Sequence, residues 1–185
     1  MTKVFIAGSI TIKNLSEEFL IRINNIVDKG LTVLVGDAGG VDLSVQEYLK
    51  NLSAENVIVY CSGYVPRNNV NSWPVVAVKV DAKEGTRAFF TAKDKEMAAV
   101  ADFGLMVWDK KSTGTLSNVI EMIKDRKMVA VYLNKDGVFF DVKTPDDLEI
   151  LVSKMSDGAR ELAEKKISLS SKLNSVRSVQ LGLGL

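Results

Sequence analysis

The sequence predicts an α/β protein with a doubly wound, mainly parallel sheet that carries helices on both faces. Three observations support this fold class. Short apolar runs rich in β-branched residues alternate with longer amphipathic segments from residue 3 to residue 133. Glycine or small polar residues follow several of the apolar runs, as they do where a strand turns into a helix. The chain has 185 residues and is 46% hydrophobic, which is enough for one domain with a sizeable core.

The N-terminal half alternates short strands with two helices. Residues 15–29 are predicted to be helical because apolar residues recur there every three to four positions, with Ser16 at the start and Gly30 at the end. Residues 42–51 form a second predicted helix, and residues 61–73 are a loop rich in Gly, Asn, Ser and Pro. The strands expected in this half are 3–7, 31–35, 57–60 and 74–80.

The second half continues the alternation and then changes character. Helices are expected at 86–100 and 115–124, and strands at 102–108 and 128–133. The Asp136-Gly137 turn predicts a hairpin to a short strand over 137–142. We therefore expect a sheet domain over 1–143, a helical extension of one or two helices over 144–173, and a flexible tail over 174–185.

The composition excludes several classes of function. A net charge of +1, from 24 basic and 23 acidic residues, gives no electrostatic reason to expect nucleic acid or an anionic membrane as a partner. The absence of histidine removes the usual general base, and together with a single cysteine it makes a zinc site unexpected. We expect no metal and no cofactor. The start Met1-Thr2-Lys3 runs directly into a strand, so no signal peptide is apparent and a cytoplasmic location is expected.

A glycine-rich turn, Gly36-Asp37-Ala38-Gly39-Gly40-Val41-Asp42, follows the strand predicted over 31–35. Glycine lets the backbone approach a ligand closely, and the N-terminus of a helix attracts anions through its free N–H groups and its dipole. The turn therefore predicts a phosphate site, although a tight strand–helix connection also uses such glycines. Asp42 is predicted to cap its own helix, with a ribose hydroxyl as the alternative partner.

A second polar turn, Ser112-Thr113-Gly114-Thr115, follows the strand predicted over 102–108. Its hydroxyl and N–H groups suit a phosphate or a ribose, and a plain N-cap by Ser112 or Thr113 is the alternative. In a doubly wound sheet, ligands bind at the carboxyl ends of the strands, near the point where the strand order reverses. We therefore expect this turn, the Gly36–Asp42 turn and the Gly8-Ser9 pair to lie on one rim.

Two further segments carry polar side chains. In the loop 61–73, Arg67 and several amides are placed to close over a ligand, while Trp73 either stacks on a base or packs beneath the loop. On the helix predicted over 86–100, Lys93 and Asp94 belong to a charge cluster with Lys95 and Glu96, of which the last two are expected to face solvent.

Five segments occur in a recognisable order along residues 3–133, namely Val4–Ser9, Gly36–Asp42, Lys93–Met97, Ala101-Asp102 and Gly114-Thr115. This order resembles the SLOG-type Rossmann-like superfamily, which contains the DNA-processing proteins and the cytokinin-activating phosphoribohydrolases. The DNA-processing branch has Gly-Gly-Ala-x-Gly-x-Asp in its first turn, where this chain has Asp37 in place of the second glycine. The resemblance implies that this turn binds a nucleotide phosphate or ribose.

The phosphoribohydrolase branch has a catalytic arginine shortly before a methionine, and a catalytic glutamate in Pro-Gly-Gly-x-Gly-Thr-x-x-Glu. In this chain Lys93 stands at the arginine position and Asn118 at the glutamate position. A lysine still contacts phosphate but lacks arginine's planar fork, and an asparagine is neither a nucleophile nor a base. The resemblance thus implies a retained binding site, with hydrolase chemistry lost or moved to Asp42, Asp94 or Asp109.

We therefore expect a protein that binds or senses a nucleotide, either a nucleoside phosphate or an ADP-ribose-like molecule. The alternatives are an enzyme that acts on an N-glycosidic bond, such as a phosphoribohydrolase or a nucleoside deoxyribosyltransferase, and a DNA-binding protein. A homo-oligomer is expected, with the helix over 86–100 as a candidate interface. If a reaction is catalysed, the candidate residues are Asp42, Lys93, Asp94 and Asn118. The expected nucleotide-binding residues are Gly8, Ser9, Gly36, Asp37, Gly39, Gly40, Asp42, Arg67, Lys93, Ser112, Gly114, Thr115 and Asn118.

Overall fold

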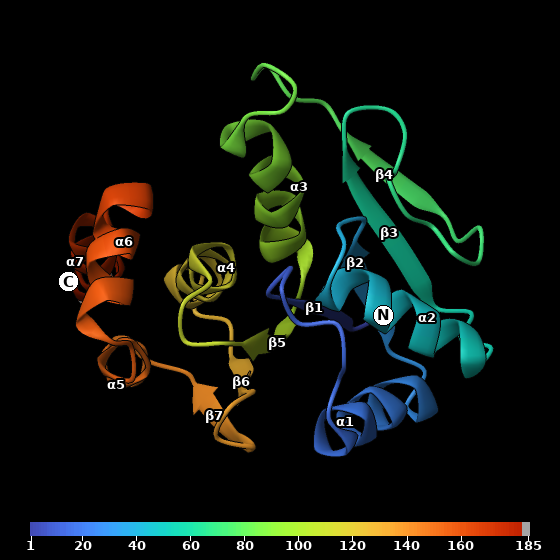
Figure 1. Ribbon diagram of the computed structural model, residues 1–185, viewed down its shortest axis with the longest axis horizontal. Coiled ribbons are helices and arrows are strands. Elements are labelled where there is room, and N and C mark those ends of the chain that lie inside the picture. The colour runs from blue at the N-terminus through green and yellow to red at the C-terminus, as the bar shows by residue number, and fades with distance from the viewer. Residues whose placement is uncertain (183–185) are drawn as a thin grey trace.

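The computed structural model of the protein describes residues 1–182 and has a seven-stranded sheet between two layers of helices (Figure 1). The strand order is β4-β3-β2-β1-β5-β6-β7, and all neighbouring strands are parallel except β6 and β7. The order reverses between β1 and β5, so the predicted doubly wound, Rossmann-like fold is confirmed. The strands are β1 (Lys3–Gly8), β2 (Thr32–Gly36), β3 (Val57–Ser62), β4 (Val75–Val78), β5 (Phe103–Trp108), β6 (Val129–Leu133) and β7 (Val138–Val142).

Helices cover both faces of the sheet because successive strand residues point to opposite sides. Ile6 and Val35 belong to the apolar layer on the face of α1 and α2, while Phe5 and Leu34 belong to the layer on the face of α3 and α4. All four side chains are completely buried. The helices are α1 (Glu17–Asp28), α2 (Val41–Asn51), α3 (Arg87–Val100), α4 (Thr113–Lys124), α5 (Pro145–Ser153), α6 (Asp157–Ile167) and α7 (Leu169–Leu181).

The C-terminal helices share a core with the sheet. Leu151 of α5, Ala163 of α6 and Val176 of α7 belong to the same buried cluster as Trp108 of β5. The sequence predicted one or two helices followed by a flexible tail from residue 174, but three helices are present and α7 covers residues 174–181. Val176 is buried in the core, and this apolar contact holds the stretch in place. The mostly polar composition of the stretch gave no sign of it. The last part of the expected tail, residues 183–185, lies outside the described residues.

Between residues 3 and 142, every predicted helix and strand boundary lies within two residues of the observed one. Helix α4 begins at Thr113 rather than Thr115 because the Ser112 side chain caps it by accepting a hydrogen bond from the Thr115 N–H. The predicted hairpin is present as the antiparallel β6–β7 pair, with Gly137 at a positive φ of 67° in its turn. Within residues 1–182, no helix has the length and apolar character required to cross a bilayer.

Candidate functional site

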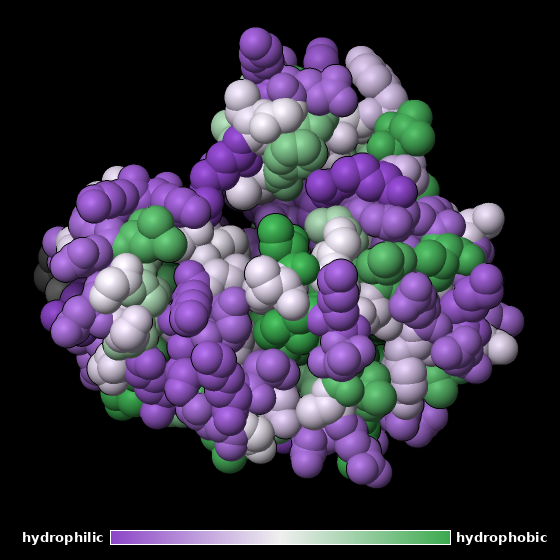
Figure 2. Space-filling model, viewed as in Figure 1, coloured by the Kyte–Doolittle hydropathy of each residue, from purple (hydrophilic) through white to green (hydrophobic). Residues whose placement is uncertain are grey.

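A cavity of about 670 Å³ opens at the carboxyl ends of β1 and β5, where the strand order reverses. We call it the main cavity. Its walls come from the loop after β1, the first turns of α3 and α4, and two residues of α6. The molecular surface is visibly hollowed between α3 and α6 (Figure 2). Both its position and its size are typical of small-molecule sites in α/β proteins.

The first turn of α4 presents backbone N–H groups to the main cavity. Thr113 and Gly114 are the first two residues of the helix, so their N–H groups have no intrahelical acceptor. Gly114 leaves open space, because a Cβ at this position would have only the Ser112 Oγ within 4 Å, at 3.9 Å. Ser112 is the N-cap of α4, as considered from the sequence, because its Oγ accepts from the Thr115 N–H. Within residues 1–182 the N–H groups of Thr113 and Gly114 still have no acceptor, and they lie at the positive end of the helix dipole.

Asp109 fixes the loop that precedes α4. Its Oδ1 accepts hydrogen bonds from the N–H groups of Lys111 and Ser112, at 2.9 and 2.6 Å. Its Oδ2 accepts from the Ser9 hydroxyl at 3.1 Å and so joins this loop to the one after β1. Burial raises the pKa of Asp109, but these hydrogen bonds outweigh it and bring the pKa below its ordinary value. Asp109 is thus an anionic anchor for both loops.

A buried ionic cluster forms the floor of the main cavity. The Lys93 side chain is only 3% exposed, and its Nζ lies 2.6 Å from Asp94 Oδ1 and 3.5 Å from Asp42 Oδ2. Burial lowers the pKa of Lys93, but the two carboxylates outweigh it and raise the pKa above its ordinary value. Lys93 is therefore a buried, charged residue. It does not face solvent, as residues of a charge cluster on a helix usually do.

Asp42 does not cap its own helix, so the capping prediction was wrong. Gly40 is the N-cap of α2 and makes no side-chain cap hydrogen bond. The Asp42 carboxylate instead accepts from the Ala38 N–H at 3.3 Å and faces Lys93. Burial, only partly offset by Lys93, raises the pKa of Asp42 to about 6. The carboxyl group lines the main cavity.

Asp37 lies behind the main cavity, where it holds Arg67. Its carboxylate accepts from the Arg67 backbone N–H at 3.0 Å, from Nε at 3.0 Å and from Nη2 at 2.6 Å. The guanidinium lies 4.8 Å from the centre of the Phe90 ring, in a cation–π contact. Arg67 therefore reaches the main cavity in a fixed orientation, which the buried Asp37 sets. Trp73 packs beneath the same loop, where its Nε1 donates to the Ala54 carbonyl.

The predicted glycines of the Gly36–Asp42 turn do not line the main cavity. Gly36 makes room for the buried ion pair, because a Cβ there would meet the Asp42 carboxylate and the Lys93 ammonium. Gly40 packs directly against the backbone of Ile10, in the loop that does line the main cavity, and Gly39 is exposed with open space around it. The turn thus supports the main cavity from behind. The predicted site residues that do line it are Gly8, Ser9, Asp42, Arg67, Lys93, Asp94, Ser112, Gly114, Thr115 and Asn118.

Asn118 places a side-chain amide at the wall of the main cavity. It is 8% exposed, lies one turn into α4, lines the main cavity, and makes no side-chain hydrogen bond within residues 1–182. An amide that faces a cavity can offer a ligand both a donor and an acceptor.

Several lining residues had no signal in the sequence. Arg87, in the first turn of α3, donates from Nη1 to Thr113 Oγ1 at 3.1 Å and so meets the α4 N-terminus. Phe90 lines the same wall, and Leu162 and Lys166 reach the main cavity from α6. No motif marks them, because the packing of α3 and α6 beside α4 brings them together.

Comparison with known proteins supports the fold. No family model and no curated protein matches the chain. Among solved structures, DNA processing protein A from Helicobacter pylori, described for its single-stranded DNA binding mode, matches with a TM-score of 0.55 and 16% identity, over 90% of this chain and 80% of that one. The molybdenum cofactor carrier protein from Chlamydomonas reinhardtii matches with a TM-score of 0.51 and 12% identity, over 97% and 98%. At these identities the comparison shows that the chain shares a fold with both proteins. One of them is a DNA-processing protein, the class to which one branch of the resemblance in the sequence points.

Proposed function

We propose that this protein binds a nucleotide in the main cavity, with the phosphate at the first turn of α4. The observation that carries the proposal is the meeting of two anion-binding features at one point. The free N–H groups of Thr113 and Gly114 lie at a positive helix end, and the Arg87 guanidinium is hydrogen-bonded to the Thr113 hydroxyl beside them. Helix N-termini and guanidinium groups both bind phosphate.

The rest of the main cavity suits a nucleoside. The unpartnered amide of Asn118 offers a donor and an acceptor to a ribose hydroxyl or a base edge. The Phe90 ring, with Arg67 stacked on it, offers an aromatic surface for a base. Lys93 contributes no net positive charge at the floor, because it is paired with both Asp42 and Asp94. The ligand class we favour is a nucleoside phosphate or an ADP-ribose-like molecule, on a SLOG-type fold.

Isothermal titration with AMP and ADP-ribose tests this proposal. We expect binding well below roughly millimolar Kd for the unaltered protein, weakened about 10- to 100-fold by Arg87→Gln, because a hydrogen bond to a charged group is lost. Asn118→Leu should weaken binding by a similar factor. Arg160→Gln, at an exposed position of α6 that does not line the main cavity, is the matched control and should bind as the unaltered protein does. Absence of binding by every nucleotide would refute the proposal.

Cleavage of an N-glycosidic bond is a second candidate, and one observation favours it. The Asp42 carboxyl lines the main cavity with its pKa raised to about 6, which suits an acid–base group near neutral pH. If the protein cleaves its ligand, adenine is released from AMP, and Asp42→Asn abolishes the release while AMP still binds. Chromatography of the reaction mixture detects the free base. No release by the unaltered protein, at AMP concentrations that saturate binding, excludes this candidate for AMP.

Two further expectations stay predictions. The first is that nucleic acid is not a partner, which was expected from the net charge of +1. The similarity in fold to a protein that binds single-stranded DNA does not support this expectation. The homo-oligomer expected from the sequence is likewise untested, and its candidate interface on α3 would lie next to the main cavity, which Arg87 and Phe90 of that helix line.

A further inference from the structure

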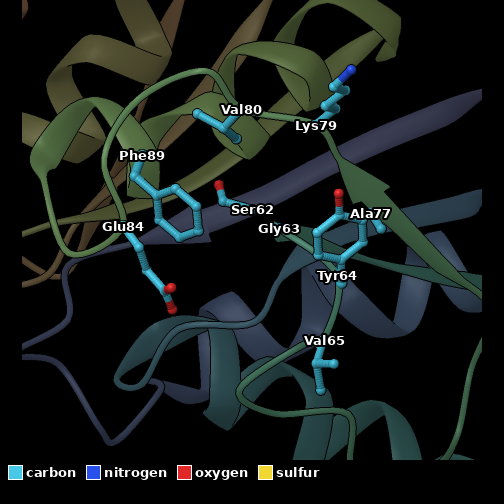
Figure 3. A pocket seen from close by; sticks show the side chains of 9 residues that line it. All are labelled: Ser62, Gly63, Tyr64, Val65, Ala77, Lys79, Val80, Glu84 and Phe89. Carbon is cyan, nitrogen blue, oxygen red and sulfur yellow. The ribbon is translucent and has the colours of Figure 1, made fainter.

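A second cavity, of about 430 Å³, lies at the carboxyl ends of β3 and β4 (Figure 3). We call it the side cavity. Figure 3 shows Phe89 and Tyr64 on opposite sides of it, with Ser62 and Gly63 between them. It opens at the same edge of the sheet as the main cavity, and the function proposed above does not use it.

The side cavity offers aromatic surface on which a flat ring can stack. Tyr64 is 91% exposed, so both faces of its ring are free of protein contacts. Gly63 has a φ of +83°, and a Cβ there would come within 3.2 Å of the Phe89 ring, so the floor between the aromatics is bare backbone. The charges at the rim, Lys79 and Glu84, are of opposite sign. The side cavity therefore suits an uncharged planar group better than a phosphate.

The two cavities adjoin across the first turn of α3. Phe89 lines the side cavity, and its neighbour Phe90 lines the main cavity. Their rings meet edge to face, with centroids 5.5 Å apart. Arg67, whose guanidinium is paired with Asp37 and lies over the Phe90 ring, brings a guanidinium group close to this boundary. Two ring-binding surfaces with a cation near their boundary match two bases joined through a phosphate.

We infer that the ligand is a dinucleotide, with one nucleoside in the main cavity and the second base stacked between Phe89 and Tyr64. The phosphate that joins the two nucleosides passes Arg67 at the boundary. This inference rests on the proposed nucleotide binding in the main cavity and adds a second base-binding site to it.

Titration calorimetry with AMP and with the linear dinucleotide pApA tests the inference. The unaltered protein should bind pApA at least about 10-fold more tightly than AMP, because base–aromatic stacking contributes at this level. Tyr64→Ala should weaken pApA binding by roughly 5- to 100-fold and leave AMP binding unchanged, whereas Tyr64→Phe should retain the affinity for pApA. The exposure of Tyr64 means that neither variant removes a buried contact, so the fold is preserved.

Four results would overturn the inference. If AMP binds and pApA binds no more tightly, or if Tyr64→Ala does not affect pApA, the side cavity takes no base and the proposed function stands alone. If neither compound binds, the proposed function itself fails and the inference falls with it. A steady further gain in affinity from pApA to a ten-nucleotide single strand would contradict a two-base site and favour a nucleic-acid groove.

Discussion

Replacement of Lys93 by methionine is expected to lower the free energy of unfolding by about 3–5 kcal/mol at pH 7, because it leaves the buried Asp42 carboxylate and the half-buried Asp94 carboxylate without their cation. Lys93 is 3% exposed and lies within 4 Å of both Asp94 and Asp42. Urea unfolding followed by circular dichroism measures the change. The loss should be smaller at pH 5 than at pH 8, because a buried carboxyl with a raised pKa becomes neutral and less costly as the pH falls.

Lys95→Met is the matched control for this prediction. Lys95 lies two residues further along α3 and is exposed, so its replacement should change the stability by no more than about 0.5 kcal/mol. If Lys93→Met and Lys95→Met had equal stabilities, Lys93 would not be the charge that balances the cluster at the floor of the main cavity.

Gly40→Ala is expected to lower the free energy of unfolding by about 2–5 kcal/mol, because it combines a strained backbone with an overpacked contact. Gly40 has φ 67° and ψ −130°, and a Cβ there would meet the backbone of Ile10. Ile10 and Thr11 line the main cavity, so the displaced loop should also weaken nucleotide binding by any protein that still folds. Thermal or urea unfolding, followed by AMP titration of the folded fraction, measures both effects.

The neighbouring glycine offers the control. A Cβ at Gly39 would have no atom within 4 Å, and Gly39 has no positive φ. Gly39→Ala should therefore keep the unfolding free energy within about 0.5 kcal/mol of the unaltered value. Equal losses for the two glycines would mean that the turn is sensitive to any side chain, and that the contact with Ile10 is not the cause.

The fold was predictable because its signals are local. The apolar runs of the strands, the periodic helices and the Asp136-Gly137 turn each depend on neighbouring residues, and all of them appear where the sequence places them. The segment 174–181 was not predictable, because its reason to be helical is the contact of Val176 with a core that distant residues build.

The site was predictable in its location and only partly in its residues. Parallel strands bring the Gly8-Ser9 pair and the α4 N-terminus to one edge, and both line the main cavity. The glycine-rich turn was wrongly predicted to hold the ligand. Gly36 and Gly40 are needed because other parts of the protein pack tightly against them, and a glycine needed for this reason looks the same in the sequence as one that makes room for a ligand. Arg87 and Lys166 could not be foreseen, because helix packing alone brings them to the main cavity.

The most direct test of nucleotide binding in the main cavity is an experimental structure of the protein with AMP. We predict density for the phosphate within hydrogen-bonding distance of the Thr113 and Gly114 N–H groups and of the Arg87 guanidinium, and for the nucleoside beside Asn118. Density for AMP at another place, or an empty main cavity at an AMP concentration that saturates binding in solution, would contradict the proposal.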